Sequence, residues 1–204
     1  MTGMVPNEVI IATVHAGGYA SLARVDDDVV GASWGFLGND GTLHSHVTGV
    51  LPDYGARGVG EALKRHQWNW ANERGLGSIT WTFDPLVRRN AYFNLVKLGA
   101  VVTDYHEDFY GSIHDGLNRG EHTDRLHVRW QVAGRGGVQP TGAYVEQAEW
   151  GIATPEDIEK LRRADRPSAT TWRDRQRADL RKVFSGGWMI SGMLRDGSFA
   201  VRPS

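Results

Sequence analysis

One stretch of the sequence, residues 42–71 (TLHSHVTGVLPDYGARGVGEALKRHQWNWA), most constrains how the chain can fold. Polar and apolar residues alternate in its first part, which is typical of a strand, and Pro52 ends that strand because proline cannot donate to a sheet ladder. The glycines of GARGVG allow a tight backbone turn. After them, apolar Val59, Leu63 and Trp70 recur near helical spacing. The stretch predicts a strand, a Gly-rich loop and a helix in direct succession.

The segments on either side of this stretch complete a pattern of strands and helices. Strands are expected at residues 19–25, 28–36, 78–83 and 124–132, and a helix is expected at 90–100, ending at Gly99. An order of strands, helix, strand, helix and strands predicts a mixed sheet covered by helices.

Glycine and proline also divide the chain into parts. The composition of residues 133–150 predicts a linker and loop, which leaves residues 1–132 as a core and residues 151–204 as an extension packed on that core. Within the extension, Thr154 and Pro155 are expected to open a helix, because Thr at the cap and Pro at the first helical position are start signals. A second, basic helix and two short strands are expected to follow.

Composition and charge exclude several classes of partner. The chain has 204 residues, a formal net charge of -1 and no cysteine. This charge argues against nucleic acid or an anionic membrane as a partner, and the lack of cysteine excludes disulfides, thiolate zinc sites and a cysteine nucleophile. No apolar run approaches the length that spans a bilayer, and no basic region precedes the N-terminal apolar residues. A cytoplasmic protein that binds neither nucleic acid nor membrane is expected.

The Gly-rich loop by itself leaves two interpretations open. Glycines at a helix N-terminus let backbone N–H groups approach a phosphate, but such loops also serve only to change the chain direction. GARGVG lacks the G-x-G-x-x-G spacing of dinucleotide-binding loops, and no Gly-Lys-Ser/Thr follows it as in nucleoside triphosphate loops. These two common nucleotide-binding loops are therefore excluded.

In its strand–loop–helix setting, GVLPDYGARGVGEAL resembles the acyl-CoA-binding signature of the GNAT N-acetyltransferase superfamily, V-x-P-x-x-[QR]-x-x-G-x-G followed by a helix. Gly55 stands where the family has Gln or Arg, which leaves the backbone donors of the loop unchanged. The residues that match are Val50, Pro52, Arg57, Gly58 and Gly60.

A second segment, RNAYFNLVKLGA, resembles the family's N-x-x-A-x-x-L-Y-x-K-x-G-F through Asn90, Lys97 and Gly99, although its Asn-to-Lys spacing is shorter. The combined resemblance covers residues 19–132. It implies a GNAT acyl-CoA N-acyltransferase fold of the α/β (α+β) class, with a mixed, mostly antiparallel sheet flanked by helices and a small C-terminal extension.

The resemblance also implies a ligand and a reaction. Acetyl-CoA or another acyl-CoA is expected as co-substrate, lying between splayed strands at 43–51 and 78–83, with its pyrophosphate on the amides of residues 55–60. The acyl group is expected to pass directly to the amine of a small molecule or amino-acid-like acceptor, without a metal. The residues expected to bind the acyl-CoA are Val50, Leu51, Gly55, Ala56, Arg57, Gly58, Val59, Gly60, Asn90 and Phe93.

His44 and His46 lie in the strand before the loop and, two residues apart, are expected to project from one face with Thr48. Taken alone, they fit a polar strand face, satisfied core histidines, or metal ligands that need a third partner. The resemblance places His44 where several GNAT members carry a catalytic Glu, and places both where arylalkylamine N-acetyltransferase has its H-x-H pair. It therefore implies that His44 and His46 form the general base, directly or through a water.

The general acid has no such match. Many GNAT proteins carry a Tyr two residues before the Lys of the second segment, where this chain has Leu95. Tyr92, Tyr105 and Tyr110 are nearby substitutes, and each also fits a packing role. The alternative is that the thiolate leaves without an assigned acid, which a thiol pKa of about 8.5 permits.

Other charged and aromatic residues are expected to be structural. Lys64 and Arg65 are expected to be solvated helix charges, and the arginines of WRDRQR (172–177) a solvated helix face. Trp34 and Trp81 flank the expected opening and fit either core packing or an acceptor-pocket wall.

The resemblance also has a gap at the N-terminus. The segment NEVIIATVHAGG matches the end of the family's second helix, so the first strand–helix unit is expected to be missing. A sheet edge left uncovered in this way invites pairing, which predicts completion by the C-terminal segment or by a homodimer. These departures keep two other functions open: a non-catalytic acyl-CoA-binding regulatory module of the same fold, and a purely structural domain.

Overall fold

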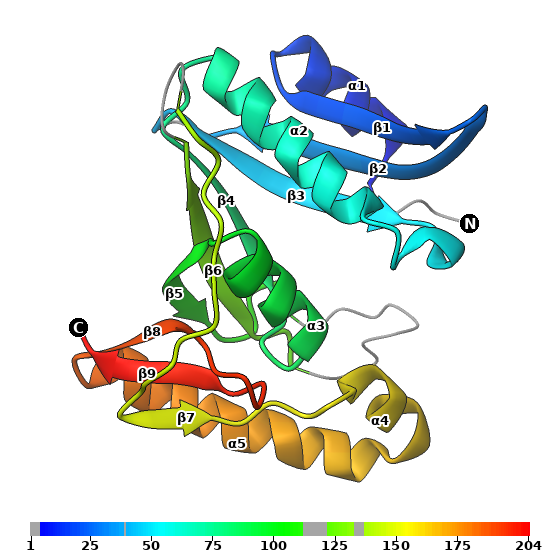
Figure 1. Ribbon diagram of the computed structural model, residues 1–204. Coiled ribbons are helices and arrows are strands. Elements are labelled where there is room, and N and C mark those ends of the chain that lie inside the picture. The colour runs from blue at the N-terminus through cyan, green and yellow to red at the C-terminus, as the bar shows by residue number, and fades with distance from the viewer. Residues whose placement is uncertain (1–4, 39, 112–121, 133–136) are drawn as a thin grey trace. The chain divides into compact units, whose positions relative to one another are not determined.

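A computed structural model describes residues 5–38, 40–111, 122–132 and 137–204 (Figure 1). The elements in chain order are α1 (Asn7–His15), β1 (Tyr19–Val25), β2 (Asp28–Leu37), β3 (Thr42–Val50), η1 (Pro52–Tyr54), α2 (Val59–Glu73), β4 (Ser78–Phe83), α3 (Arg88–Ala91), η2 (Tyr92–Lys97), β5 (Val101–His106), β6 (Arg125–Gln131), β7 (Trp150–Ile152), α4 (Ile158–Ala164), α5 (Arg166–Ser185), β8 (Trp188–Met193) and β9 (Phe199–Pro203).

The strands form two sheets. The larger has six strands in the order β1-β2-β3-β4-β6-β5, and the smaller has three in the order β7-β9-β8. In the larger sheet β1–β2, β2–β3 and β5–β6 are antiparallel, whereas β3 and β4 are parallel. This is the mixed, mostly antiparallel sheet flanked by helices that the sequence predicted.

The chain divides into two compact units. The first unit comprises Met1–Trp81 and Trp130–Gln139, and the second comprises Thr82–Arg129 and Pro140–Ser204. The chain therefore passes from the first unit to the second within β4 and returns within β6.

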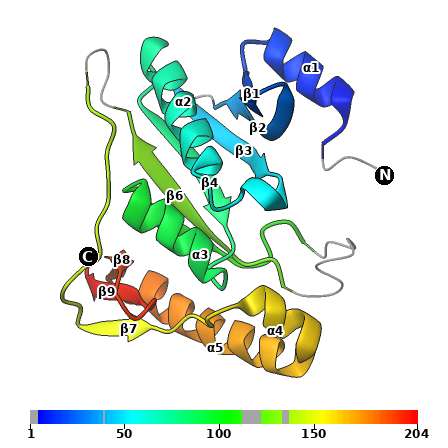
Figure 2. The ribbon, with the colours of Figure 1, turned by 45° about the vertical axis from the view of Figure 1, so that its right-hand side comes forward.

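In the first unit, helices cover both faces of β1–β3. Helix α2 contacts all three strands and buries Leu63 and Trp68 on its sheet-facing side (Figures 1 and 2). Helix α1 contacts β1 and β2, where the Trp34 indole Nε1 donates to Thr13 Oγ1 at 2.9 Å. Trp34 is buried, as its core interpretation predicted, and β1 forms one edge of the sheet.

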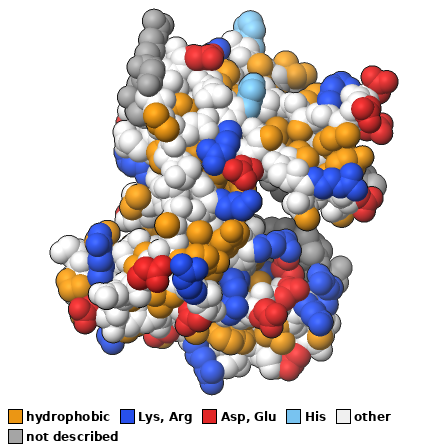
Figure 3. Space-filling model, in the orientation of Figure 1, with side chains coloured by type: hydrophobic (Ala, Val, Ile, Leu, Met, Phe, Trp, Pro, Cys, Tyr) orange, Lys and Arg blue, Asp and Glu red, His pale blue; other side chains and the backbone are white. Residues whose placement is uncertain are grey.

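In the second unit, α5 packs against β5, β7 and β8. An apolar cluster of Leu86, Val87, Ile158 and Ala169 joins the segment after β4 to α4 and α5. On the face in Figure 3, the charged side chains of both signs are interspersed.

One helix start differs from the sequence prediction. The helix expected to open at Thr154 and Pro155 begins at Ile158, because the Asp157 carboxylate accepts from the Lys160 N–H at 2.9 Å and so caps it. Thr154 is instead buried, with its hydroxyl donating to the Gly197 carbonyl at 2.7 Å. Thr154 and Asp157 are both residue types that cap helices, and the sequence does not show which of the two side chains reaches a helix amide.

The helix expected at residues 90–100 is present, but most of it is a π-helix and not an α-helix. It consists of one α-helical turn, α3, followed directly by the π-helix η2. Part of the expected linker at 133–150 lies outside the described residues.

Candidate functional site

The Gly-rich loop leads from β3 into the N-terminus of α2. Gly58 is the residue before the helix and has φ +79°, a left-handed conformation that glycine adopts without strain. No atom lies within 4 Å of the point where its Cβ would be. The first amides of a helix have no intrahelical partner, and the helix dipole makes this end positive. The loop therefore presents N–H donors and open space to an anion, the requirement for a pyrophosphate.

The charged side chains around the loop are held by neighbours in the first unit. The Arg57 guanidinium lies 4.9 Å from the Tyr54 ring centroid. Glu61, the acidic residue in the first turn of α2, pairs with Arg65 at 2.9 Å. The negative charge in the first turn of the helix is therefore paired with a cation on the same helix.

Strands β3 and β4 separate at a defined point. Their recorded pairing joins Thr42–His44 to Ser78–Thr80, whereas β3 continues to Val50 and the loop. Beyond His44 and Thr80 the two parallel strands therefore diverge. An extended ligand that carries amide groups can pair with strand backbone at such an opening.

His44 and His46 project from the same face of β3, as predicted. Their ring centroids are 5.8 Å apart, and the Phe36 ring lies 4.9 Å from His44 and 5.8 Å from His46. Trp34 also meets His46 edge-on at 5.3 Å. The His46 side chain remains accessible to solvent, but its neighbours shield part of the ring. This partial desolvation lowers the pKa of His46 below its ordinary value. At neutral pH His46 is therefore mainly uncharged and able to accept a proton.

A β-bulge sits at His46. Trp34 pairs with Val47 and Gly35 with Ser45, so His46 is the extra residue of β3. A Cβ on Gly35 would lie only 2.5 Å from the His44 carbonyl oxygen, so this close approach requires glycine. The bulge breaks the alternation of the strand, and the prediction that Thr48 continues the histidine row is wrong.

The side chains of Ser45 and Thr48 confirm this change of face. The Ser45 hydroxyl accepts from Lys64 of α2, and the Thr48 hydroxyl lies 2.8 Å from that of Ser33. Ser33 in turn lies 3.5 Å from Gln67 Nε2, also on α2. Ser45 and Thr48 therefore lie on the α2 side of the sheet, opposite the histidine rings.

Comparison with known proteins connects this geometry to a family. The family model described as acetyltransferase (GNAT) domain matches residues 11–92, which include β1–β4, the loop and both histidines. This part of the chain is therefore similar to a GNAT acetyltransferase domain. No curated protein sequence matches the chain.

Solved structures resemble this GNAT fold at low sequence identity. The ribosomal-protein-S18-alanine N-acetyltransferase from Escherichia coli has a TM-score of 0.52 at 14% identity, covering 67% of this chain and 84% of its own. A GNAT family acetyltransferase from Elizabethkingia anophelis with acetyl-CoA bound has a TM-score of 0.51 at 17% identity, covering 62% of this chain and 83% of its own. Arabidopsis thaliana Naa50 in complex with the bisubstrate analogue CoA-Ac-MVNAL has a TM-score of 0.51 at 23% identity, covering 63% of this chain and 84% of its own. At these identities the likeness establishes the fold.

The residues predicted to bind acyl-CoA fall into two groups. Those from Val50 to Gly60 lie together in the first unit, at the end of β3 and the start of α2, within the residues that the GNAT family model matches. Asn90 lies on α3 and Phe93 on η2, and both belong to the second unit. Their role in binding stays a prediction.

The tyrosines considered as general acids all have other contacts in the second unit. The Tyr105 hydroxyl donates to the Asp124 carboxylate at 2.7 Å, and burial together with this hydrogen bond raises its pKa. The Tyr110 hydroxyl lies 3.4 Å from Thr82 Oγ1, and Tyr92 packs against another tyrosine ring at 5.9 Å. None of the three is assigned as an acid.

The prediction that Lys64 is a solvated charge is wrong. Lys64 is only 3% exposed, and its ammonium group lies over the Trp81 ring at 3.6 Å from the centroid. Desolvation by burial lowers its pKa to about 7. The signal that sequence reasoning missed is spacing, since Lys64, Gln67 and Ala71 lie on one helix face.

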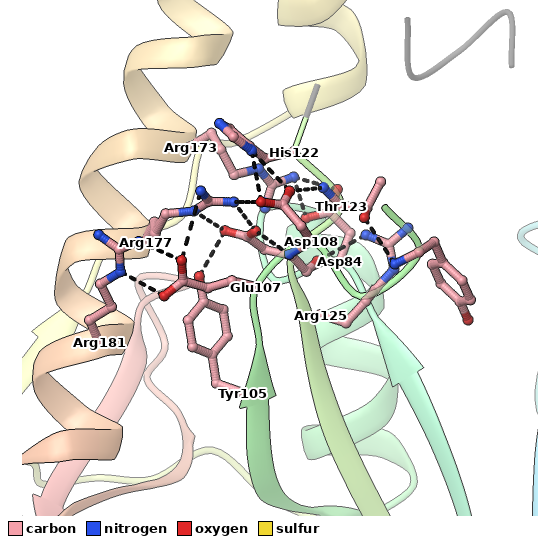
Figure 4. Close-up of polar contacts among 12 residues, drawn as sticks. Asp84, Tyr105, Glu107, Asp108, His122, Thr123, Arg125, Arg173, Arg177 and Arg181 are labelled. Atoms are coloured by element: carbon pink, nitrogen blue, oxygen red, sulfur yellow. Dashed lines mark hydrogen bonds and ion pairs between the residues drawn. The ribbon is translucent and has the colours of Figure 1, made fainter. Parts of the chain in front are cut away.

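The arginines of α5 were also predicted to be solvated, and two of them are not. Arg173 is 3% exposed and pairs with Asp84 at 2.8 Å, while Arg177 donates to the Asp124 carboxylate at 2.9 Å (Figure 4). Figure 4 shows these side chains pointing from α5 toward the carboxylates of the segments that follow β4 and β5. This network belongs to the second unit and holds α5 in place.

Two other kinds of site have no candidate among the described residues. Among the described residues, no group of three or more His, Asp or Glu side chains is placed to hold a metal ion. In the same part of the chain, no helix is both long and apolar enough to cross a membrane.

Proposed function

We propose that this chain is an acyl-CoA-dependent N-acyltransferase, in the simplest case an N-acetyltransferase, that acts on the amine of a small molecule or an amino-acid-like acceptor. One coincidence within the first unit carries the proposal. Strand β3 separates from β4 beyond His44, ends at a Gly-rich helix N-terminus, and carries two imidazoles at the point of separation.

The acyl-CoA would be held mainly by backbone groups. Within the loop, the N–H groups of Gly55 and Arg57 already donate to the carbonyls of Pro52 and Tyr54. The amides from Gly58 to Gly60 would therefore receive the pyrophosphate, because helix N-terminal N–H donors and the helix dipole both favour anions. The backbone of β3 near Val50 and Leu51 would pair with the amides of the pantetheine arm. Gly55 does not weaken this scheme, since the donors are backbone groups.

The reaction would be direct attack of the acceptor amine on the thioester. The amine nitrogen forms a bond to the carbonyl carbon, the carbon–sulfur bond breaks, and the thiolate leaves with the bonding electron pair. The amine must give up a proton for this attack, and His44 and His46 would accept it, either directly or through a water. Because a thiol has a pKa of about 8.5, the thiolate can leave without an assigned acid.

The family and the structural relatives support the type of donor. Two of the relatives described above were solved with acetyl-CoA or with an analogue that joins CoA to a peptide. The E. coli relative is described as acetylating an alanine of a ribosomal protein. These facts concern those proteins, and the acceptor proposed here rests on the chemistry of the histidine pair.

The test is release of free CoA from acetyl-CoA in the presence of a panel of primary amines. We expect His44→Gln and His46→Gln each to lower kcat about 10²–10⁴-fold, the range for loss of a general base. His15→Gln, at the exposed end of α1, is the matched control and should retain full activity. The acidic limb of the wild-type pH–rate profile should lie below about 6.5, because the pKa of His46 is lowered.

Two outcomes would contradict the proposal. Binding of acetyl-CoA without CoA release for any amine would identify a non-catalytic acyl-CoA-binding module. No thermal stabilisation by acetyl-CoA or succinyl-CoA would exclude both functions and leave a structural domain.

We further propose a homodimer formed along β1, the edge strand of the larger sheet. Sedimentation at micromolar concentration should show a dimer, and a monomer would contradict this. A dimer that persists when Leu22 on β1, which is exposed, is replaced by Lys would place the contact elsewhere.

A further inference from the structure

The buried face of α2 carries a polar cluster that the proposed reaction does not use. Within the cluster, the ammonium group of Lys64 donates to Ser45 Oγ at 2.9 Å and to Gln67 Oε1 at 3.0 Å, and lies 3.6 Å from the centroid of the Trp81 ring. In the part of the chain that the structure describes, no carboxylate pairs with it. A helix that needs only to cover a sheet places an apolar side chain at such a position.

The cluster reaches β3 at two places. Lys64 contacts Ser45, the residue before the bulge at His46. Gln67, through its Nε2, lies 3.5 Å from the Ser33 hydroxyl, and that hydroxyl donates to the carbonyl of Val47, the residue after the bulge, at 3.3 Å. The two α2 side chains are therefore linked to both sides of His46, directly at Ser45 and through the Ser33 hydroxyl at Val47.

Lys64 also lies at the point where the strands part. The last recorded pair of the two parallel strands is His44 with Thr80. Ser45 and Trp81, the two neighbours of the ammonium group, are the residues that directly follow this pair. The ammonium group thus joins β3 to β4 at the place where their backbone pairing ends.

We propose that Lys64, together with Gln67, is a positioning residue that holds the bulge of β3 from the α2 side and thereby fixes where the imidazoles of His44 and His46 lie on the opposite side. The inference rests on the proposed function as far as catalysis is concerned. Its physical basis is that a bulge leaves one residue unpaired, so the backbone around it has fewer ladder hydrogen bonds to define its position. Buried hydrogen bonds from a packed helix supply that definition.

The cost of this arrangement argues against a purely structural role. Burying an ammonium group without a carboxylate is unfavourable, and the lowered pKa of Lys64 reports this cost. A methionine would fill the same space without desolvating a charge. Stability alone would therefore favour an apolar residue at this position. Holding the backbone of the bulge in one position requires a side chain that donates hydrogen bonds, as Lys64 does.

The experiment measures three variants: Lys64→Met, Ser45→Ala and the double variant that carries both changes. Each is compared with the control variant Arg65→Met. Arg65 is the adjacent residue of α2, is partly exposed, pairs with Glu61 and Gln139 and serves as the matched control. We expect Lys64→Met and Ser45→Ala each to lower kcat at least about tenfold, with KM for acetyl-CoA changed less than about twofold, since the loop is untouched. The double variant should be no slower than the slower single variant, because both changes break one contact.

A second readout does not depend on catalysis. The imidazole resonances of His44 and His46 can be titrated by NMR in the free protein. Loss of the bulge geometry should raise the titration midpoint of His46 toward about 6.5 in both Lys64→Met and Ser45→Ala, and leave it unchanged in Arg65→Met. Ser45→Ala keeps the ammonium charge, so a shift in that variant cannot come from charge removal, and it retains the test if Lys64→Met does not fold.

The outcomes separate the two proposals. Full kcat and unchanged histidine titration in both single variants of an active enzyme would overturn the positioning role while the proposed function stands. A shift in Lys64→Met without one in Ser45→Ala would also overturn it, since the effect would then be that of charge alone. Shifted titration in a chain without transferase activity would support the positioning role and refute the proposed function.

Discussion

The two units of the molecule bury charge in opposite ways. In the first unit, the single cation Lys64 is enclosed by neutral partners: Ser45, Gln67 and the Trp81 ring. In the second unit, Asp84 lies between Arg162 and Arg173, each at 2.8 Å, so that every buried charge in the contact has a counter-charge. Both clusters are buried, but only in the second are the cations paired with a carboxylate.

The pKa values show what this difference does. Burial alone raises the pKa of Asp84, but the attraction of Arg173 and Arg162 outweighs burial and lowers it. For Lys64, burial acts without a counter-charge, so it lowers the pKa and favours the neutral amine. The charged form is therefore stabilised in the second unit and destabilised in the first. A cluster of paired charges is suited to holding elements together, and a buried cation without a carboxylate indicates a role other than stability.

The largest expected effect is that of breaking the cluster of paired charges. Asp84→Asn should lower the free energy of unfolding by about 3–5 kcal/mol, because it removes the buried carboxylate that pairs with the guanidinium groups of both Arg162 and Arg173. The difference from wild type should be present above pH about 4 and vanish as the pH falls through the lowered native pKa, where the wild-type carboxyl is also protonated.

The control for this change is the exposed pair of Arg89 and Glu159, whose side chains are 71% and 36% accessible. Glu159→Gln should cost less than about 1 kcal/mol by denaturant unfolding. Equal losses in the two variants would mean that burial does not distinguish the pairs, and the comparison of the two units would fail.

The next largest effect has the opposite sign. Lys64→Met should raise the free energy of unfolding at pH 7, because the native state no longer holds a desolvated amine. Between the native pKa of about 7 and the unfolded value of about 10.4, the unfolded wild type binds more protons than the native protein. Wild-type stability should therefore rise with pH relative to the variant, by on the order of 1 kcal/mol per pH unit.

Denaturant unfolding of both proteins at pH 7, 8 and 9 measures this difference directly. The gap between variant and wild type should narrow as the pH rises. A constant gap would show that the amine has an ordinary pKa in the native protein, and Lys64 would then not carry the cost that separates it from the arginine network.

The sequence predicted the fold well because its periodic signals are local. The alternation of β1–β3, the turn glycines and the helix after the Gly-rich loop each appear within a window of a few residues. The bulge at His46 has no such signal, since it depends on the register between β2 and β3. The two histidines share a face as predicted, but the strand reaches that arrangement with one extra residue.

The buried charges were missed for a related reason. A lysine or arginine is solvated by default, and only its position on a helix face argues otherwise. Lys64 lies three residues before the buried Gln67 and seven before the buried Ala71, and Arg173 and Gln176 are both on the buried side of α5. Spacing thus marks these positions as inward-facing, but the partners that make burial tolerable, Ser45 and Asp84, lie far away in the sequence.

A smaller loss is expected from one neutral contact of the arginine network. Tyr105→Phe removes the hydrogen bond to the Asp124 carboxylate and should cost about 1–2 kcal/mol in unfolding free energy, because Arg177 still pairs with that carboxylate. Tyr92→Phe is the matched control, since no hydrogen bond of its hydroxyl is recorded in the described residues. A cost for Tyr105→Phe as large as that for Asp84→Asn would mean that hydrogen bonding, and not charge pairing, dominates the cluster.

The smallest effect is expected at the solvent end of the same helix. Arg181, whose side chain is 59% accessible, pairs with Glu107 through its Nε at 2.6 Å. Arg181→Gln should cost less than about 1 kcal/mol, and this cost should fall further in 1 M salt, where the Debye length shrinks to about 3 Å. The loss in Asp84→Asn should persist at that salt concentration, because buried pairs are screened much less. If both losses disappear together in salt, the Asp84 pair behaves as a surface pair, and only Lys64 remains as a charge whose burial has energetic consequences.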